Sequence, residues 1–221
     1  MNKNIFTILF VALVTILFAN CDRDEFNKTE PTQGGVIIAG IEWARTNVAA
    51  SGTFADNPED AGMFFQWNRG RGWAVADEWG EWIYSPGGEP FRINYAIVGW
   101  DDTNAAGSSW MRINDPCPAG WRVPTRAELR RLADTGGIWT TQNGVNGHRF
   151  GNSPHYLFLP AAGSRHINGE LGLDGRWGHY WSNAQGANAL WAHILLISEG
   201  STYVLNNLRR AHGFSVRCVA E

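Results

Sequence analysis

Lysine and cysteine are both scarce in this chain of 221 residues. The lysines, Lys3 and Lys28, lie near the N-terminus, and no run of Lys or Arg follows. With a formal net charge of -3, the sequence lacks the basic character that nucleic-acid binding requires, so we exclude nucleic acid as a partner. Local catalytic signatures such as Gly-x-Ser-x-Gly, His-Glu-x-x-His, Cys-x-x-Cys and a phosphate-binding glycine loop are also missing. The sequence therefore indicates a protein that is not an enzyme.

No cofactor or metal is predicted. A calcium site needs six to eight oxygen ligands, and no loop carries regularly spaced Asp residues. The histidines share no ligand spacing, which leaves open a cluster formed only in three dimensions. A pair of catalytic carboxylates would leave no local pattern either, so an uncharacterised carbohydrate-active enzyme stays an alternative.

Residues 1–21 have the features of a lipoprotein signal peptide. Lys3 precedes the apolar run IFTILFVALVTILF, and FANC leads to Cys21. The apolar run is too short for a comfortable membrane span. The segment resembles the lipobox of bacterial lipoproteins, which implies cleavage before Cys21 and lipidation of its thiol. The alternative is ordinary secretion, with Cys21 inside an uncleaved signal.

Residues 22–35 are predicted to form a flexible tether, because they are polar and carry no apolar periodicity. The acidic residues of DRDEF resemble the signal that directs Bacteroidota lipoproteins to the outer face of the outer membrane. We therefore expect an outer-membrane lipoprotein that is exposed at the cell surface, with the membrane as partner through a lipid anchor. The globular body is expected to span residues 36–221.

The other two cysteines, Cys117 and Cys218, form an even pair in an oxidising compartment, where disulfides persist. Pro116 and Pro118 stiffen the backbone around Cys117. This favours a structural bridge over the alternative, a reactive thiol, which needs exposure and a nearby positive charge. We expect Cys117 and Cys218 to be joined.

One helix is predicted over residues 126–134. Thr125 and Glu128 have the spacing of a capping box behind Pro124, and Gly136 follows the last apolar position. Apolar or alternating runs predict strands in GVIIAGIEWARTNVA, GMFFQWN, YLFLPAAG, GHYWSNA, ALWAHILLIS and GFSVRCVA.

The alternation in GFSVRCVA predicts two sides for the last of these strands. Phe214, Val216 and Cys218 are expected on the buried side, and Ser215 and Arg217 on the other.

The stretches VIIAGIEWARTNV, GMFFQWNR, DPCPAGWRVPTRAEL, LPAAGSR, GHYWSN and RAHGFSVRCV, taken in order, resemble the Fibrobacter succinogenes major paralogous domain. The resemblance covers about residues 36–220. It implies an α+β fold, a single C-type-lectin-like domain in which a twisted antiparallel sheet carries long loops and at least one flanking helix. It implies little about chemistry, because fold alone does not determine function.

The candidate ligand site is the stretch QWNRGRGWAVADEWGEW, residues 66–82. Aromatic rings on glycine-rich loops beside guanidinium and carboxylate groups are typical of binding surfaces. The candidate residues are Trp73, Trp79, Trp82, Arg69, Arg71, Asp77, Glu78 and Glu81. The alternative is that Arg side chains stack on Trp rings only to stiffen long loops. Trp67 and Trp121 are expected in the core.

These features together indicate a cell-surface lipoprotein whose body binds a glycan or a protein without catalysis. A structural role in a surface fibre or an uptake complex is the first alternative. The carbohydrate-active enzyme named above is the second.

Overall fold

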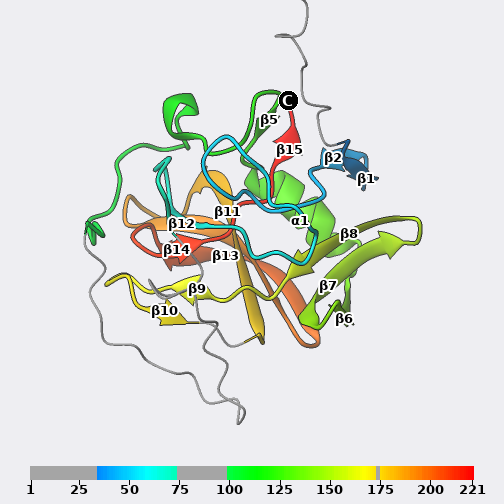
Figure 1. Cartoon of the computed structure of the whole chain (residues 1–221). Helices are drawn as coiled ribbons and strands as arrows, with labels where there is room; N and C mark the ends of the chain where they lie inside the picture. The colour runs from blue at the N-terminus through cyan, green and yellow to red at the C-terminus, as the bar shows by residue number, and fades with distance from the viewer. Residues whose placement is uncertain (1–33, 74–98, 173–174) are drawn as a thin grey trace, which may run out of the picture. The chain divides into compact units, whose positions relative to one another are not determined.

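Strands dominate this computed structural model, which describes residues 34–73, 99–172 and 175–221 (Figure 1). Strand residues make up 44% and helical residues 8%. The predicted α+β, C-type-lectin-like class is therefore wrong, and the fold is largely β and sandwich-like. The predicted class came from the resemblance, and strands of two or three residues are too short to produce a readable period that would have corrected it. The described residues all fall in the unit Gln33–Glu221.

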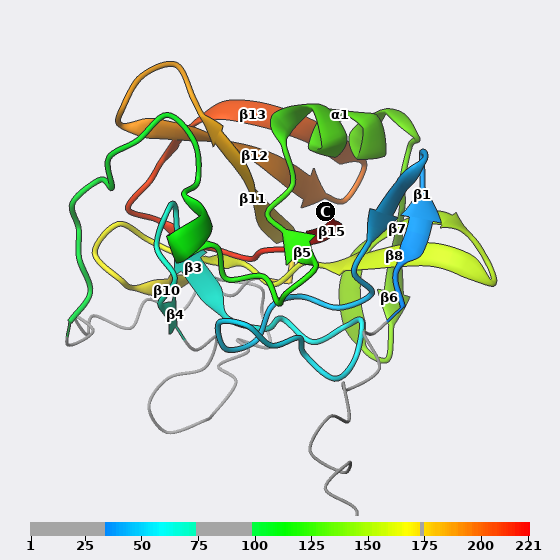
Figure 2. The ribbon, with the colours of Figure 1, turned by 90° about the horizontal axis from the view of Figure 1, so that it is seen from above.

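The strands form antiparallel sheets in the described part of the chain (Figures 1 and 2). Their orders are β1(Val36–Ile38)-β2(Ile41–Trp43)-β15(Val219–Ala220)-β5(Trp121–Arg122), β10(Leu171–Gly172)-β9(Ser164–Arg165)-β14(Gly213–Phe214)-β3(Phe64–Gln66)-β4(Gly72–Trp73), β11(Trp177–Gln185)-β12(Trp191–Ser198)-β13(Ser201–Arg209) and β6(Ile138–Gln142)-β7(Val145–Asn152)-β8(His155–Pro160). A short 3-10 helix, η2, spans Arg112–Asn114.

The predicted helix is confirmed as α1, Arg126–Asp134. The side chain of Thr125 accepts a hydrogen bond from the backbone N–H of Glu128, and the Glu128 carboxylate accepts one from the backbone N–H of Thr125, so the capping box is complete. Arg122 also donates to both oxygens of Glu128, at 2.9 and 2.6 Å. The start of α1 is therefore tied to strand β5. Within the described residues, no helix is long and apolar enough to span a membrane.

The sheet β11–β13 lies between two apolar clusters, because alternate residues of β12 point to opposite faces. Leu195 and Ile197 pack with Leu129 and Leu132 of α1, which crosses this sheet (Figure 2). On the other face, Ile194 and Leu196 join a cluster that contains both predicted core tryptophans, Trp67 and Trp121, and the half-cystines Cys117 and Cys218. Both faces of β12 are therefore buried.

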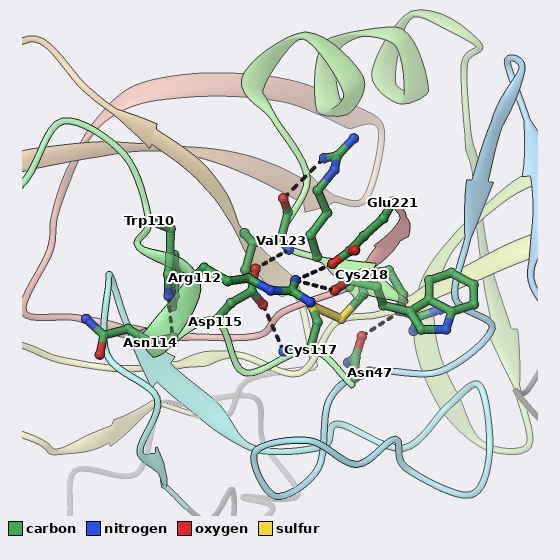
Figure 3. Close-up of a disulfide and its surroundings, with 12 residues drawn as sticks. Asn47, Trp110, Arg112, Asn114, Asp115, Cys117, Val123, Cys218 and Glu221 are labelled. Atoms are coloured by element: carbon green, nitrogen blue, oxygen red, sulfur yellow. Dashed lines mark hydrogen bonds and ion pairs between the residues drawn. A yellow bond between two sulfur atoms is a disulfide. The ribbon is translucent and has the colours of Figure 1, made fainter. Parts of the chain in front are cut away.

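The predicted disulfide between Cys117 and Cys218 is confirmed, with Cα atoms 6.0 Å apart across 101 residues of sequence (Figure 3). The carboxylate of Asp115 accepts hydrogen bonds from the backbone N–H groups of Cys117, at 2.9 Å, and Val123, at 3.1 Å. Arg112 forms an ion pair with Glu221 beside it (Figure 3). The disulfide and these contacts hold the C-terminal strand against the segment that leads into α1.

Phe214, Val216 and Cys218 lie together in one buried cluster, as the alternation of GFSVRCVA predicts, but the segment is not one continuous strand, because β14 ends at Phe214 and β15 begins at Val219. Ser215 and Arg217, expected on the other side, are 0% and 1% exposed, as deeply buried as Phe214 and Cys218. The guanidinium of Arg217 donates instead to Asn47 Oδ1, Ala44 O and Arg45 O. The segment is covered on both sides, so polarity did not indicate exposure here.

Candidate functional site

The five-stranded sheet β10-β9-β14-β3-β4 carries the residues of the candidate site. Cross-strand partners in an antiparallel sheet point to the same face, and neighbours along a strand point to opposite faces. The pairings Phe64↔Trp73 and Gly213↔Arg165 belong to one face. The pairing Phe214↔Phe65 belongs to the other. We call these the tryptophan face and the histidine face.

On the tryptophan face, Trp100 lies over bare backbone. A Cβ atom added to Gly169 would come within 3.0 Å of the Trp100 ring, and one added to Gly213 within 2.9 Å. The indole N–H of Trp100 donates to Ile167 O at 2.8 Å. The ring of Trp100 lies 5.0 Å from that of Trp73, centroid to centroid. The Trp100 ring thus packs directly on the backbone at Gly169 and Gly213, and its side chain is half-buried.

Two predicted arginines lie at the edge of this tryptophan pair. The guanidinium carbon of Arg71 lies 4.2 Å from the ring centroid of Trp73, in cation–π geometry, and Arg71 is exposed. Arg69 forms an ion pair with Asp101 and donates to Thr103 O at 3.2 Å. Arg69 therefore anchors the segment that carries Trp100, while Arg71 is an exposed charged group that contacts the Trp73 ring.

Trp73 is only 7% exposed, and Arg71 and Trp100 are among the side chains that pack on its ring. Its indole Nε1 has no hydrogen-bond partner among the described residues. This burial matches the loop-stiffening alternative for Trp73 better than direct ligand contact. The other predicted site residues, Trp79, Trp82, Asp77, Glu78 and Glu81, and the lipidation site Cys21 lie outside the described residues.

Buried polar side chains hold the segment 99–111 in place. The Gln66 amide donates to Asp101 O and to Ala211 O, and the Asn68 amide donates to Ala106 O. Arg210, fully buried, donates to Ala105 O at 2.7 Å and lies 4.0 Å over the ring of Trp67. Because these donors belong to β3, its following turn and the β13–β14 connection, the position of Trp100 is fixed by the core.

Asp101 is held as a carboxylate. The side chain and the backbone N–H of Thr103 donate to it at 2.5 and 2.9 Å, and these hydrogen bonds, with the Arg69 guanidinium adding to them, lower the pKa of Asp101 to about 2. Asp101 therefore stays ionised at any ordinary pH, opposite the Arg69 guanidinium. It neutralises one of the two arginines beside the tryptophans and leaves the exposed Arg71 as the available positive group.

On the histidine face, two imidazole rings stack on Phe214. His179 lies at 4.8 Å and His212 at 5.3 Å from the phenyl centroid, with interplanar angles of 14° and 17°. His166 lies 6.1 Å from His212. Burial lowers the pKa of His179 to about 4 and also lowers that of His212, so both rings are neutral at pH 7.

Sequence reasoning missed Trp100, His166 and His212, although it left open a histidine cluster formed in three dimensions. No local pattern in the sequence marked Trp100, because Gly169 and Gly213 become informative only once the fold places the Trp100 ring against them. In the described ranges 34–73, 99–172 and 175–221, no group of three or more His, Cys, Asp or Glu side chains is arranged to hold a metal ion.

Comparisons with protein-family models, with curated proteins and with solved structures find no match for this chain. The resemblance to the Fibrobacter succinogenes major paralogous domain accordingly stays a prediction from the sequence. The geometry of the site itself is therefore the basis on which we infer a function.

Proposed function

We propose that the protein is a lipid-anchored, outer-membrane surface protein whose β-rich body binds a glycan or protein ligand without catalysis. The observation that carries this proposal is the tryptophan face, where Trp100 is seated on Gly169 and Gly213 and flanked by Trp73 and the exposed Arg71. A rigid indole supplies a flat apolar surface for stacking, and the neighbouring guanidinium supplies hydrogen-bond donors. Neither contact requires much loss of conformational entropy on binding.

The proposed contact differs from the one expected from sequence, because Trp100 replaces Trp73 as the ring that meets the ligand. The Trp100 ring is half-buried and held by its hydrogen bond to Ile167 O, and the rest of its surface stays accessible to a ligand. Because the side chain is already ordered, binding does not have to immobilise it, which saves conformational entropy. Trp73 supports Trp100 from the side. The signal-peptide pattern that ends at Cys21 supports the lipid anchor, and the acidic stretch DRDEF that follows it supports the surface location.

The direct test is a screen of a glycan array and a displayed peptide library with the body, residues 36–221. Binders of the wild type should be lost or weakened at least about tenfold by Trp100→Ala and by Arg71→Ala. Trp191→Ala is the matched control, since Trp191 is also half-buried with an arginine, Arg209, over its ring at 5.9 Å. Binders that respond equally to Trp100→Ala and Trp191→Ala would contradict the proposal.

A structural role in a surface assembly is the second candidate, and two observations favour it. Trp73 is buried against its own segment, which suits a stiffening role. Met111, just before η2, is 50% exposed, and Ile113, on η2, is 86% exposed. Such exposure is unusual for large apolar side chains that lie close together. An assembly role predicts that the body self-associates in sedimentation and that Ile113→Ser abolishes this. A monomer at high concentration would exclude self-assembly.

A further inference from the structure

We propose that His166 and His212 form a two-histidine chelate for a borderline transition-metal ion such as Zn²⁺, Ni²⁺ or Cu²⁺. Imidazole nitrogen suits these metals, whereas Ca²⁺ and Mg²⁺ prefer oxygen. The inference is independent of the proposed function, because it concerns the histidine face of the sheet.

The register of the sheet places the two histidines opposite each other. Gly213 of β14 pairs with Arg165 of β9 in antiparallel fashion, so the same register continued by one residue beyond both strands puts His212 opposite His166. Directly opposite residues have Cβ atoms about 4.5–5.5 Å apart and point to the same face. The observed centroid separation of 6.1 Å shows that both rings do point to that face.

This spacing suits a single metal ion. With metal–nitrogen bonds of about 2.0–2.1 Å, two imidazoles on one tetrahedral ion have centroids roughly 5 Å apart. The rings of His166 and His212 are about 1 Å further apart than that, which a modest side-chain rotation can close. His179 also stacks on Phe214, but in the described part of the chain it does not group with His166 and His212 into a set of three metal-holding side chains, so we assign the chelate to the pair alone.

The hydrogen bonding of His212 prepares it as a ligand. Its Nδ1 lies 3.0 Å from the carbonyl oxygen of Arg209, which can only accept, so Nδ1 carries the proton and Nε2 keeps its lone pair. A histidine ligand that donates its second N–H to a backbone carbonyl is the usual arrangement at metal sites. Burial lowers the pKa of His212, which keeps the ring in the neutral form that binds metal.

His166 supplies the accessible half of the pair. Its side chain is exposed, and the position closest to its Nε2 on β10 is Gly172, which has no side chain to cover it. Because no third ligating side chain is grouped with the pair in the described part of the chain, water completes the coordination. The charged group that opposes the cation is Arg209, whose positive charge also lowers the pKa of His212.

The test is calorimetric titration of the full chain with Zn²⁺ and Ni²⁺ at pH 7.5, with the thermal midpoint followed in parallel. We expect saturable binding that raises the midpoint, because the folded state alone presents the pair. His166→Gln and His212→Gln should each weaken binding by at least about tenfold, and exposed His155→Gln should leave it unchanged.

Binding that survives both single variants, or no saturable binding by the wild type, would overturn the proposal. If His212→Gln disturbs the packing on Phe214, His166→Gln still decides the question, since the His166 side chain is exposed. A midpoint that rises with metal in the wild type but not in His166→Gln would support the chelate independently of the heat signal.

Discussion

Arg217 Nε donates to Asn47 Oδ1 at 2.9 Å, although 170 residues separate the two. Both side chains are buried, and Arg217 also donates to Arg45 O at 2.7 Å. Burial lowers the pKa of Arg217 to about 10, so it is still charged at neutral pH. Its Nη2 has no partner among the described residues. This contact joins the first part of the body to the segment that leads into its last strand, β15, in parallel with the disulfide.

Arg217→Met should therefore be strongly destabilising. It leaves the buried acceptors Asn47 Oδ1 and Ala44 O without this donor, at about 1–3 kcal/mol for each group, and it removes the part-buried hydrogen bond to Arg45 O. We expect the free energy of unfolding in urea to fall by at least about 3 kcal/mol. Arg130→Met, at an exposed position of α1, is the control and should change it by less than about 0.5 kcal/mol. Equal effects would show that the Arg217 contacts contribute nothing.

The Cys117–Cys218 disulfide should contribute about 2–5 kcal/mol, since it closes a long loop of the unfolded chain. The double variant Cys117→Ala, Cys218→Ala should unfold at a correspondingly lower urea concentration than the oxidised wild type. Reduced wild type should behave like the double variant. In a Cys21→Ser background, the unfolded and unreduced chain should show no titratable thiol, and two thiols would refute the bridge.

Acid should destabilise the fold through its buried histidines. Burial lowers the pKa of His179 to about 4 and also lowers that of His148, whose Nε2 donates to Ser198 O. The unfolded chain therefore takes up protons first as the pH falls below about 6.5, so the free energy of unfolding decreases from there towards pH 4. Urea denaturation between pH 7.5 and pH 4.5 measures this slope.

His179→Phe should reduce the pH dependence, because phenylalanine can keep the stack on Phe214 but cannot take up a proton. Exposed His155→Phe is the matched control and should leave the slope unchanged. If His179→Phe has the wild-type slope, another group causes the acid sensitivity.

The capping box of α1 should be worth about 1 kcal/mol. Thr125→Ala removes the hydroxyl that accepts from the Glu128 N–H at 3.2 Å and should lower the free energy of unfolding by that amount. Thr125→Ser retains the acceptor and should cost little. A full loss in Thr125→Ser would mean that the threonine methyl group, and not the cap, is responsible.

Local and covalent features could be predicted from the sequence. The signals for α1 lie within a dozen residues, and the disulfide followed from the parity of the cysteines in the expected compartment. Alternation placed Arg217 on the side opposite Cys218, but it could not show that this side is buried as well. The pairing of His166 with His212 depends on the register of β9 with β14, which two-residue strands do not encode locally.

The most direct test of the binding proposal is an NMR titration of protein with ¹⁵N-labelled indoles, using the tightest ligand from the screens. The indole N–H of Trp100 donates to Ile167 O, so its resonance reports on the tryptophan face. We predict that the Trp100 signal shifts in proportion to ligand occupancy while the Trp191 signal stays in place. A ligand that shifts Trp191 and leaves Trp100 unchanged would contradict the proposed site.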